Sequence, residues 1–441
     1  MRGLSKPSRQ LMRLWPSSSI PPRALAPIST IQWCRYSSSA PDSSSSSSSS
    51  PPGGSGIDIA AIKAEMLARR PQTHLDIMHP KNSDLLTKAL SDFLPKECFP
   101  RQRGKPYWMI YNDHDRYKSQ VPPVPPVLPP GHHLVYFPLH LRGSELCPDG
   151  TDPYHSPRNT PFTRRMWAGG SIWGFGSMRL SSELALCFER IVDVTVRGAA
   201  GAEKIFVDVL REYTTNKHYR KLSKSDSLRL SSRLEPPMYN PLSLVDSATR
   251  TRYKDDRGIT ERRTLVFMRE LSSEEKRMNL EQEQRNVKVP TNPDYSVTLT
   301  PTPTLLFHYS ALTYNAHRIH LDRAYCREVE GHRDPLVHGP LSLTMMLSVL
   351  RSRLAQREVV DSIDYRHLAP LYVSQPMRIC VARQKPRARA DKSQDGDDTD
   401  GAAMTKGQGQ LSINKWDVWV ENQDGGICVK GTAETLTLPA W

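Results

Sequence analysis

The sequence lacks features that would place it in several common classes of protein. Its seven cysteines in 441 residues form neither a CxxC pair nor a regular framework, which argues against disulfides and against a zinc-thiolate site. Aromatic residues make up only 7%, and there is no stacking-aromatic motif or Gly-Arg run of the kind that binds RNA. No segment approaches the roughly 18 uncharged apolar residues of a membrane helix. We therefore expect a soluble protein of a reducing compartment, without membrane insertion and without nucleic acid.

Acidic residues are missing from the first 41 positions, which hold six lysines and arginines and many serines. This composition is typical of a mitochondrial transit peptide, and cleavage near Tyr36 fits it. A disordered basic tail is the alternative interpretation. We predict a transit peptide over residues 1–36, a Ser/Pro/Gly-rich linker over residues 37–56, and a mature protein in the mitochondrial matrix.

The net charge of the whole chain is +14, and removal of residues 1–56 takes away six basic residues and one acid, which leaves +9. A basic balance favours anionic partners, among them nucleic acid, an acidic carrier protein and the phosphates of coenzyme A. The basic residues are scattered rather than grouped in a stripe, so a basic protein without a basic binding site is an equal alternative.

The densest group of potential catalytic side chains lies between Phe307 and Leu354. Asn315, His317 and His320 share one short loop, and eighteen residues after His320 the chain reads His338-Gly339-Pro340. Glycine is a plausible N-cap, and proline suits a first helical turn because it lacks an amide that would have no partner there. The pattern predicts a helix that begins beside a histidine-rich loop.

The predicted helix carries apolar residues on nearly every side, so it must be buried. The segments that follow it are β-rich and lack helical periodicity, and strands without intervening helices pair antiparallel. They are residues 359–365, 371–381, 412–420 and 427–438. One central helix wrapped by an antiparallel sheet is the hot-dog arrangement, an α+β fold.

Five sequence segments resemble a known family. SALTYNAHRIHLDRAY and LVHGPL look like the catalytic loop and helix start of the hydratase 2 (MaoC-like) hot-dog enzymes, in particular the mitochondrial hydroxyacyl-thioester dehydratase type 2 branch. Upstream, LPPGHHLVYFPL, PDGTD and RRMWAGGSI resemble the first half of the same two-repeat family. The resemblance covers most of residues 57–441 and implies a double hot-dog, two antiparallel sheets each wrapped on a central helix.

On this basis the chain divides into an N-terminal hot-dog-like domain and a C-terminal catalytic one. We place the first, without a histidine loop and non-catalytic, at residues 57–270, and the second at residues 301–441. Residues 271–294 are polar and rich enough in glutamate and arginine to be a helix or a charged connector, and we place the charged connector at residues 271–300. Residues 384–410 are of low complexity and are predicted to be a disordered loop.

Dehydration of a 3-hydroxyacyl thioester needs a group that moves protons and donors that hold the enolate-like thioester oxygen. His320 is the candidate acid/base, because histidine titrates near working pH. The backbone amide of Gly339 at the helix start is the candidate oxyanion donor. Further candidate substrate-binding residues are His317, Arg318, His338, Pro340 and Trp167.

Each of these residues could instead have a purely structural role. His338 could be a hydrogen-bonded core histidine, Arg318 a solvated surface arginine and Trp167 a core side chain. His317 and His320 have the spacing of a metal pair, but no cysteine or carboxylate cluster completes it. We therefore expect no metal and no other cofactor.

The loop departs from the family motif at one important position. The hydratase 2 motif D-x-N-P-x-H has an aspartate five residues before its histidine, and Asn315 stands there in this chain. Asparagine can orient a water but cannot accept a proton. Either His320 performs both proton transfers, or His317 or Asp322 takes the vacant role.

The favoured function is reversible dehydration of 3-hydroxyacyl thioesters to trans-2-enoyl thioesters in mitochondrial type II fatty-acid synthesis, which the resemblance implies would act on an acyl-carrier protein or a coenzyme A thioester. Hydration of a dicarboxylic acyl-CoA of the mesaconyl or itaconyl type is an alternative, with Arg318 pairing the free carboxylate. The asparagine at position 315 also allows a non-catalytic thioester-binding scaffold. A homodimer is compatible with each of these functions.

Overall fold

The computed structural model describes residues 57–99, 101–102, 105–106, 126–199, 201–215, 258–281, 292–385 and 412–438. The predicted transit peptide and linker lie outside these ranges, as does nearly all of the predicted disordered loop. In the part of the chain that is described, no helix is long and apolar enough to cross a membrane.

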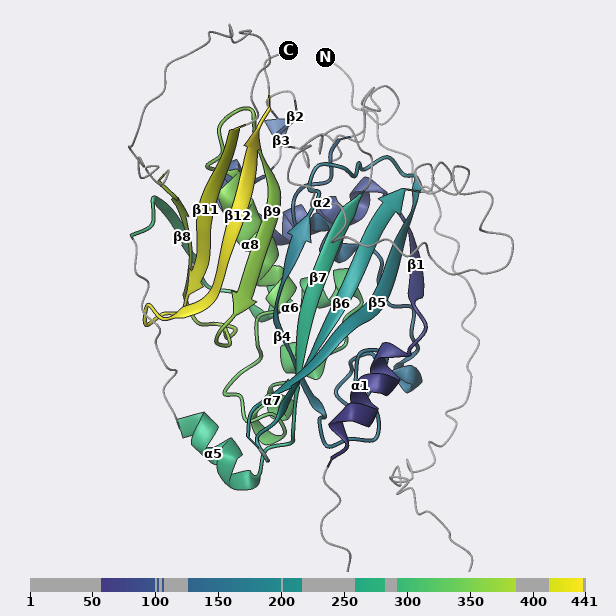
Figure 1. Ribbon diagram of the computed structural model, residues 1–441. Helices are drawn as coiled ribbons and strands as arrows, with labels where there is room; N and C mark the ends of the chain where they lie inside the picture. Colours follow the sequence, from purple (N-terminus) through teal and green to yellow (C-terminus); the bar gives the residue numbers. More distant parts are fainter. Residues whose placement is uncertain are drawn as a thin grey trace, which may run out of the picture. The chain divides into compact units, whose positions relative to one another are not determined.

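One ten-stranded sheet organises the described residues, in the order β1-β5-β6-β7-β4-β9-β12-β11-β10-β8, and every pairing in it is antiparallel (Figure 1). The N-terminal strands are β1 (Gln72–Ile77), β4 (Arg164–Trp173), β5 (Leu184–Arg197), β6 (Lys204–Thr215) and β7 (Ile259–Met268). The C-terminal strands are β8 (Tyr295–Leu299), β9 (Glu358–His367), β10 (Met377–Arg383), β11 (Ser412–Glu421) and β12 (Ile427–Thr437). A separate two-stranded ribbon joins β2 (Arg101–Gln102) and β3 (Lys105–Pro106).

The helical segments occupy the faces and ends of this sheet. The α-helices are α1 (Ile59–Leu67), α2 (Pro80–Leu90), α5 (Ser273–Glu281), α6 (Pro303–Thr313), α7 (Arg323–Glu328) and α8 (Gly339–Arg351). The 3-10 turns are η1 (Lys96–Cys98), η3 (His132–Val135), η4 (Gly143–Glu145) and η6 (Arg318–His320).

Helix α8 is the central helix of the C-terminal half. All ten residues from 341 to 350 are buried, and the helix packs on β9, β10 and β11. Its serines and threonines do not oppose burial, because Ser342, Thr344 and Ser348 each donate their hydroxyl to the carbonyl four residues earlier. Burial of each leucine or methionine side chain stabilises the folded state by about 1.5–3 kcal/mol. The predicted hot-dog arrangement is confirmed in this half.

The N-terminal half fills its interior differently. Among the described residues, the short turn η3 and the amphipathic helix α2 contribute to one apolar core that also includes α8. Gly131 begins η3 at φ +85°, and a Cβ there would lie 3.1 Å from the Thr344 Cα. Glycine therefore lets η3 approach the central helix of the other half.

The two halves share a sheet as well as a core. Strand β4 pairs with β9 from Gly169 opposite Arg366 to Trp173 opposite Ser362, which joins the two five-stranded halves edge to edge. Residues 56–441 accordingly form one compact unit. The double hot-dog is thus a single continuous sheet.

The predicted connector at residues 271–300 contains one strand of the C-terminal sheet. Strand β8 lies in it, pairs with β10 and buries Val297 and Leu299 in the common core, so the C-terminal half begins before residue 301. Five residues of alternating burial are too short a signal to separate from the polar sequence around them. Helix α5 occupies the charged part and has no buried residue.

Candidate active site

The histidine loop begins where helix α6 ends. Tyr314 adopts the left-handed conformation at φ 51° and closes the helix. The Asn315 side-chain oxygen then accepts a hydrogen bond from the His317 backbone amide at 3.0 Å, while the Asn315 backbone amide donates to the Ser310 carbonyl at 2.9 Å. This local turn brings the His317 and His320 rings to a centroid distance of 5.4 Å. Asn315 therefore supports the loop with both its side-chain oxygen and its backbone amide.

The tautomer of His320 follows from its surroundings. Its Nδ1 lies 2.8 Å from the Leu336 carbonyl oxygen, which can only accept, so Nδ1 carries the proton and Nε2 keeps its lone pair. Burial lowers the pKa of His320 to about 4, because its loss of hydration outweighs the Leu336 hydrogen bond, and Arg165 lowers it further. His320 is neutral at pH 7 and can accept a proton through Nε2.

His338 stacks against His320 at the entrance to helix α8. The ring centroids are 3.7 Å apart and the planes differ by 21°. His338 is fully buried, and its Nε2 lies 2.8 Å from the Ser310 hydroxyl. Burial holds its pKa well below 6.5. A neutral ring that stacks on His320 and bonds to α6 agrees with the core-histidine interpretation, and it also fixes the orientation of His320.

The start of α8 is crowded at Gly339, whose backbone amide has no bonded acceptor among the described residues. Gly339 is the first residue of the helix and Pro340 lies in its first turn. A Cβ on this glycine would lie 3.0 Å from His367 Cε1 and 3.2 Å from Trp167 Cβ. The sequence-predicted residues Trp167, Gly339 and Pro340 are therefore brought together with His367.

Trp167 reaches this position from the strand that joins the two halves. Its indole donates to the Tyr365 hydroxyl at 3.0 Å, and the Arg263 guanidinium lies over its ring at 4.7 Å. Burial lowers the pKa of the neighbouring His367 to about 4, and its Nε2 has no partner among the described residues. Tyr365 and His367 gave no signal in the sequence, because they lie in an ordinary strand far from the histidine loop.

A loop of the N-terminal half packs on the histidine loop. The Arg318 amide donates to the Asp149 carbonyl at 2.8 Å, and Asp149 Oδ2 lies 3.5 Å from His317 Nε2. Gly150 has φ +84°, and a Cβ there would overlap the Ala316 carbonyl. Only glycine allows this approach. Asp149 lies in the PDGTD segment, whose resemblance to the family was its only sequence signal.

Arg318 lies on the surface, and its contacts are not those of a residue that holds the substrate. Its guanidinium donates to Asp322 at 2.7 Å and lies over the Tyr325 ring at 4.3 Å. Asp322 also accepts from the Tyr325 amide as the N-cap of α7. Both residues are thus engaged with the short helix, which does not support Arg318 as the carboxylate partner or Asp322 as the missing acid/base.

No group of three or more His, Cys, Asp or Glu side chains that could hold a metal ion occurs among the described residues. The chemistry that these contacts support is proton transfer by neutral histidine beside a helix N-terminus.

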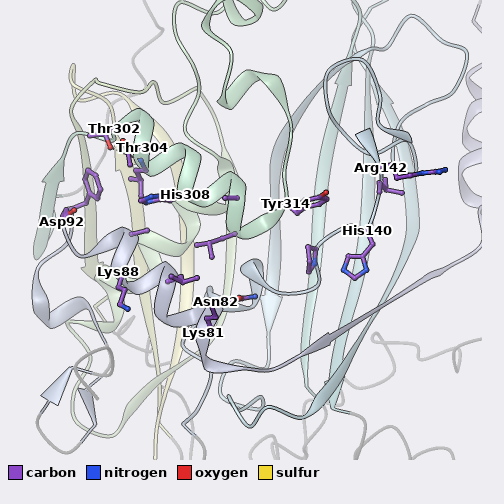
Figure 2. A pocket seen from close by; sticks show the side chains of 18 residues that line it. Lys81, Asn82, Lys88, Asp92, His140, Arg142, Thr302, Thr304, His308 and Tyr314 are labelled. Atoms are coloured by element: carbon purple, nitrogen blue, oxygen red, sulfur yellow. Dashed lines mark hydrogen bonds between the residues drawn. The ribbon is translucent and has the colours of Figure 1, made fainter. Parts of the chain in front are cut away.

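A separate groove of about 1370 Å³ lies between α2 and α6 (Figure 2). His308 lines it from α6, whereas Ser310, which bonds His338, is about 200° further round the same helix. The groove and the histidine site therefore lie on opposite sides of α6. Lys81 and Lys88 border the groove from α2, and Arg142 borders it from the start of η4.

The fold and the site together define a hot-dog protein with the proton-transfer geometry of a thioester hydratase or dehydratase. A sequence model of the hydroxyacyl-thioester dehydratase type 2 family matches residues 131–238 and 238–373, which is more than half of the chain. The chain belongs to the hydroxyacyl-thioester dehydratase type 2 family.

The chain is also similar to individual proteins. The mitochondrial hydroxyacyl-thioester dehydratase type 2 of Schizosaccharomyces pombe is 28% identical over 58% of this chain and 78% of that protein. The mesaconyl-C(4)-CoA hydratase of Chloroflexus aurantiacus is 43% identical, but over only 19% of this chain and 29% of that protein. A solved MaoC-like dehydratase from Phytophthora capsici is 10% identical with a TM-score of 0.47, covering 85% of this chain and 97% of that one.

Proposed function

We propose that this protein reversibly dehydrates 3-hydroxyacyl thioesters to trans-2-enoyl thioesters, in the type II fatty-acid synthesis of the mitochondrial matrix. The observation that carries the proposal is that His320, neutral and with its Nε2 lone pair available, stacks on His338, the residue that directly precedes Gly339 at the start of α8. His338 thus connects the two groups, because its ring contacts that of His320 and its backbone continues into Gly339. A base and an oxyanion donor are the two parts that this reaction requires.

The reaction can be written with His320 as the proton carrier. Its Nε2 removes a proton from C2, and the electrons of that C–H bond form an enolate whose oxygen accepts from the Gly339 amide. The dipole of α8 adds positive potential there. The C3–O bond then breaks as the imidazolium returns its proton to the departing hydroxyl, so that water and the enoyl thioester are formed.

Turnover by the purified mature chain tests the proposal. We expect loss of the enoyl-thioester absorbance when crotonyl-CoA is hydrated, and its appearance when a 3-hydroxyacyl thioester is dehydrated. His320→Ala, shown to be folded by circular dichroism, should abolish nearly all of this signal. A wild-type chain that is folded and turns over neither substrate would contradict the proposal and favour a non-catalytic scaffold.

The match to the mesaconyl-C(4)-CoA hydratase favours one second candidate, hydration of a dicarboxylic acyl-CoA. Such a substrate needs a cation for its free carboxylate, and Arg318 is exposed and paired with Asp322. Mesaconyl-CoA in the same assay separates the two candidates. A kcat/KM for mesaconyl-CoA above that for crotonyl-CoA would favour the second.

We further propose that the acyl group is delivered by an acidic carrier protein that docks at the groove between α2 and α6. Lys81, Lys88 and Arg142 line this groove together with one carboxylate, Asp92. Lys88 and Arg142 also pair with nearby acids, whereas Lys81 has no ion-pair partner among the described residues. An unpaired lysine on such a rim attracts an acidic partner and increases its association rate.

Lys81→Glu separates carrier delivery from delivery by coenzyme A. We expect the KM for an enoyl group on acyl-carrier protein to rise several-fold, more strongly at low salt, while the KM for crotonyl-CoA stays the same. Lys430→Glu, at an exposed position of β12 that does not line the groove, is the matched control for a loss of positive charge. Equal KM values for the carrier substrate in both variants would contradict docking at this groove.

A further inference from the structure

The site described so far lacks a second group beside His320 for the reacting hydroxyl. Asn315 occupies the position of the family's aspartate, and its side-chain oxygen is used by the His317 amide at 3.0 Å. Asp322 caps α7 and pairs with Arg318. Of the two residues considered for the vacant position beside His320, this leaves His317, whose ring is 5.4 Å from that of His320.

His317 faces a buried carboxylate that comes from the other half of the chain. Asp149 is 5% exposed, and its Oδ1 accepts from both the amide and the hydroxyl of Thr151, at 2.9 and 2.7 Å. Its Oδ2 remains, 3.5 Å from His317 Nε2. This contact is not a closed hydrogen bond, and the Nε2 has no hydrogen-bond partner among the described residues, although His317 is only 5% exposed. A buried ring nitrogen without a partner is costly unless this contact closes.

Backbone contacts hold the two loops close together. The Arg318 amide bonds to the Asp149 carbonyl at 2.8 Å, and Gly150 leaves space for the Ala316 carbonyl, where a Cβ would overlap it. Asp149 and His317 are therefore held together by backbone contacts on both sides. Their approach does not depend on the rotamer of a long side chain.

We propose that Asp149 is a positioning residue that holds the proton of His317 on Nε2, so that Nδ1 of His317 keeps its lone pair, accepts a hydrogen bond from the 3-hydroxyl of the substrate and orients that hydroxyl toward the proton carried by His320. The proposal rests on the proposed dehydratase function and supplies a contact for the reacting hydroxyl that Asn315 does not offer, because its side-chain oxygen is used by the His317 amide. A carboxylate that accepts from one ring nitrogen fixes the tautomer and leaves the other nitrogen with its lone pair.

The groups around His317 keep its ring neutral, as this role requires. Its pKa is held well below 6.5, first by burial and then by His320, Arg165 and His332, with a smaller opposing effect from Asp152. A neutral ring has one N–H and one lone pair, so the Asp149 contact decides which nitrogen has each. The N-terminal half, predicted to be non-catalytic, then contributes a residue on which the active site depends.

Asp149→Asn is the test with the least structural change. Its Oδ1 can still accept from Thr151, while its NH2 would face His317 Nε2 and reverse the tautomer. We expect kcat for crotonyl-CoA hydration to fall about 10- to 100-fold, the usual cost of losing a carboxylate that orients a histidine, with KM changed less than about threefold. Asp334→Asn, which removes a surface carboxylate paired with Arg323, is the matched control and should retain wild-type kcat.

A double-mutant cycle distinguishes positioning from a structural role. If Asp149 acts through His317, Asp149→Asn should have little further effect on kcat in a His317→Gln background. Additive losses in the cycle, or a large fall in the melting temperature of Asp149→Asn, would overturn the proposal. Wild-type kcat in folded Asp149→Asn would overturn it as well.

The tautomer can also be observed without turnover. Long-range ¹⁵N–¹H NMR of histidine-labelled protein, with His317→Gln to assign the ring, should show the proton on Nε2 in the wild type and on Nδ1 in Asp149→Asn. An Nδ1 proton in the wild type would refute the pairing. If the wild type turns over no thioester, the proposed function fails, and this spectrum still decides whether Asp149 fixes His317.

Discussion

The pH dependence of kcat/KM tests the assignment of His320 most directly. An ordinary histidine with a pKa near 6.5 would be only about 3% neutral at pH 5, whereas one with a pKa near 4 is about 90% neutral. Burial lowers the pKa of His320 to about 4, so the free base persists into acid. We expect crotonyl-CoA hydration to keep most of its kcat/KM at pH 5 and to lose it around pH 4.

The protein must also stay folded over the same pH range, and three half-buried histidines limit its stability in acid. His320, His332 and His367 each have a pKa lowered to about 4, chiefly by loss of hydration. Between pH 6.5 and 4 these three side chains therefore bind more protons in the unfolded chain than in the folded one. Their stabilising effect is complete above pH 6.5 and is lost as the pH falls to 4, by about 3 kcal/mol for each such residue.

One buried histidine has the opposite sign. Burial lowers the pKa of His155, but the carboxylates of Asp152 and Glu189 more than offset this and raise it to about 9. Its stabilising effect is complete below pH 6.5 and is lost as the pH rises through 9. We expect the melting temperature to be highest between pH 4 and pH 9 and to fall toward either value.

The assay is initial-rate hydration of crotonyl-CoA from pH 4 to 8, with circular dichroism at each pH to exclude unfolding. His320→Gln should remove the acid limb together with most of the rate. A folded wild-type enzyme whose kcat/KM falls with a midpoint near pH 6.5 would refute the inference that a buried, neutral His320 is the base.

Three further predictions concern the site and the N-terminus. His320→Ala should lower kcat about 100- to 10,000-fold, and Gly339→Val should cost about 2.7–4 kcal/mol of transition-state stabilisation, because its side chain would press on His367 and Trp167 and displace the amide. Their double mutant, assayed with crotonyl-CoA, should show less than the sum, because both groups act on one transition state. Asn315→Asp should keep measurable activity because Oδ1 still supports the loop, while Asn315→Ala should lose about 10- to 100-fold, and equal rates in all three would exclude Asn315 from the site. Residues 1–36 should be absent from the cellular protein when its N-terminus is sequenced, and an intact Met1 would contradict the transit peptide.

The local part of the site could be predicted from the sequence. His317 and His320 are close in the chain, and the Gly339-Pro340 pair has the chemistry of a helix start. The apolar residues of α8 on every side indicated a buried helix, and burial of all ten residues from 341 to 350 agrees with this. These features depend on neighbours within a few residues, and for that reason a single sequence contains them.

The N-terminal contributions could not be found in this way. Asp149 and His317 are far apart in the chain, and their approach depends on Gly150 fitting against the Ala316 carbonyl. Trp167 and His367 meet at Gly339 because β4 pairs with β9. No periodicity in the sequence specifies that pairing, because an antiparallel register is set by contacts between strands that are distant in sequence.

By itself, the sequence determined the buried central helix, the histidine loop before it and the absence of an acid at position 315. Only the tertiary structure decided that Arg318 points to the surface, that β8 belongs to the C-terminal sheet, and that Asp149 faces His317. The physical reason is the same in each case. Helix caps and burial patterns are local properties of the chain, whereas the environment of an ionisable side chain is set by whatever the fold packs against it.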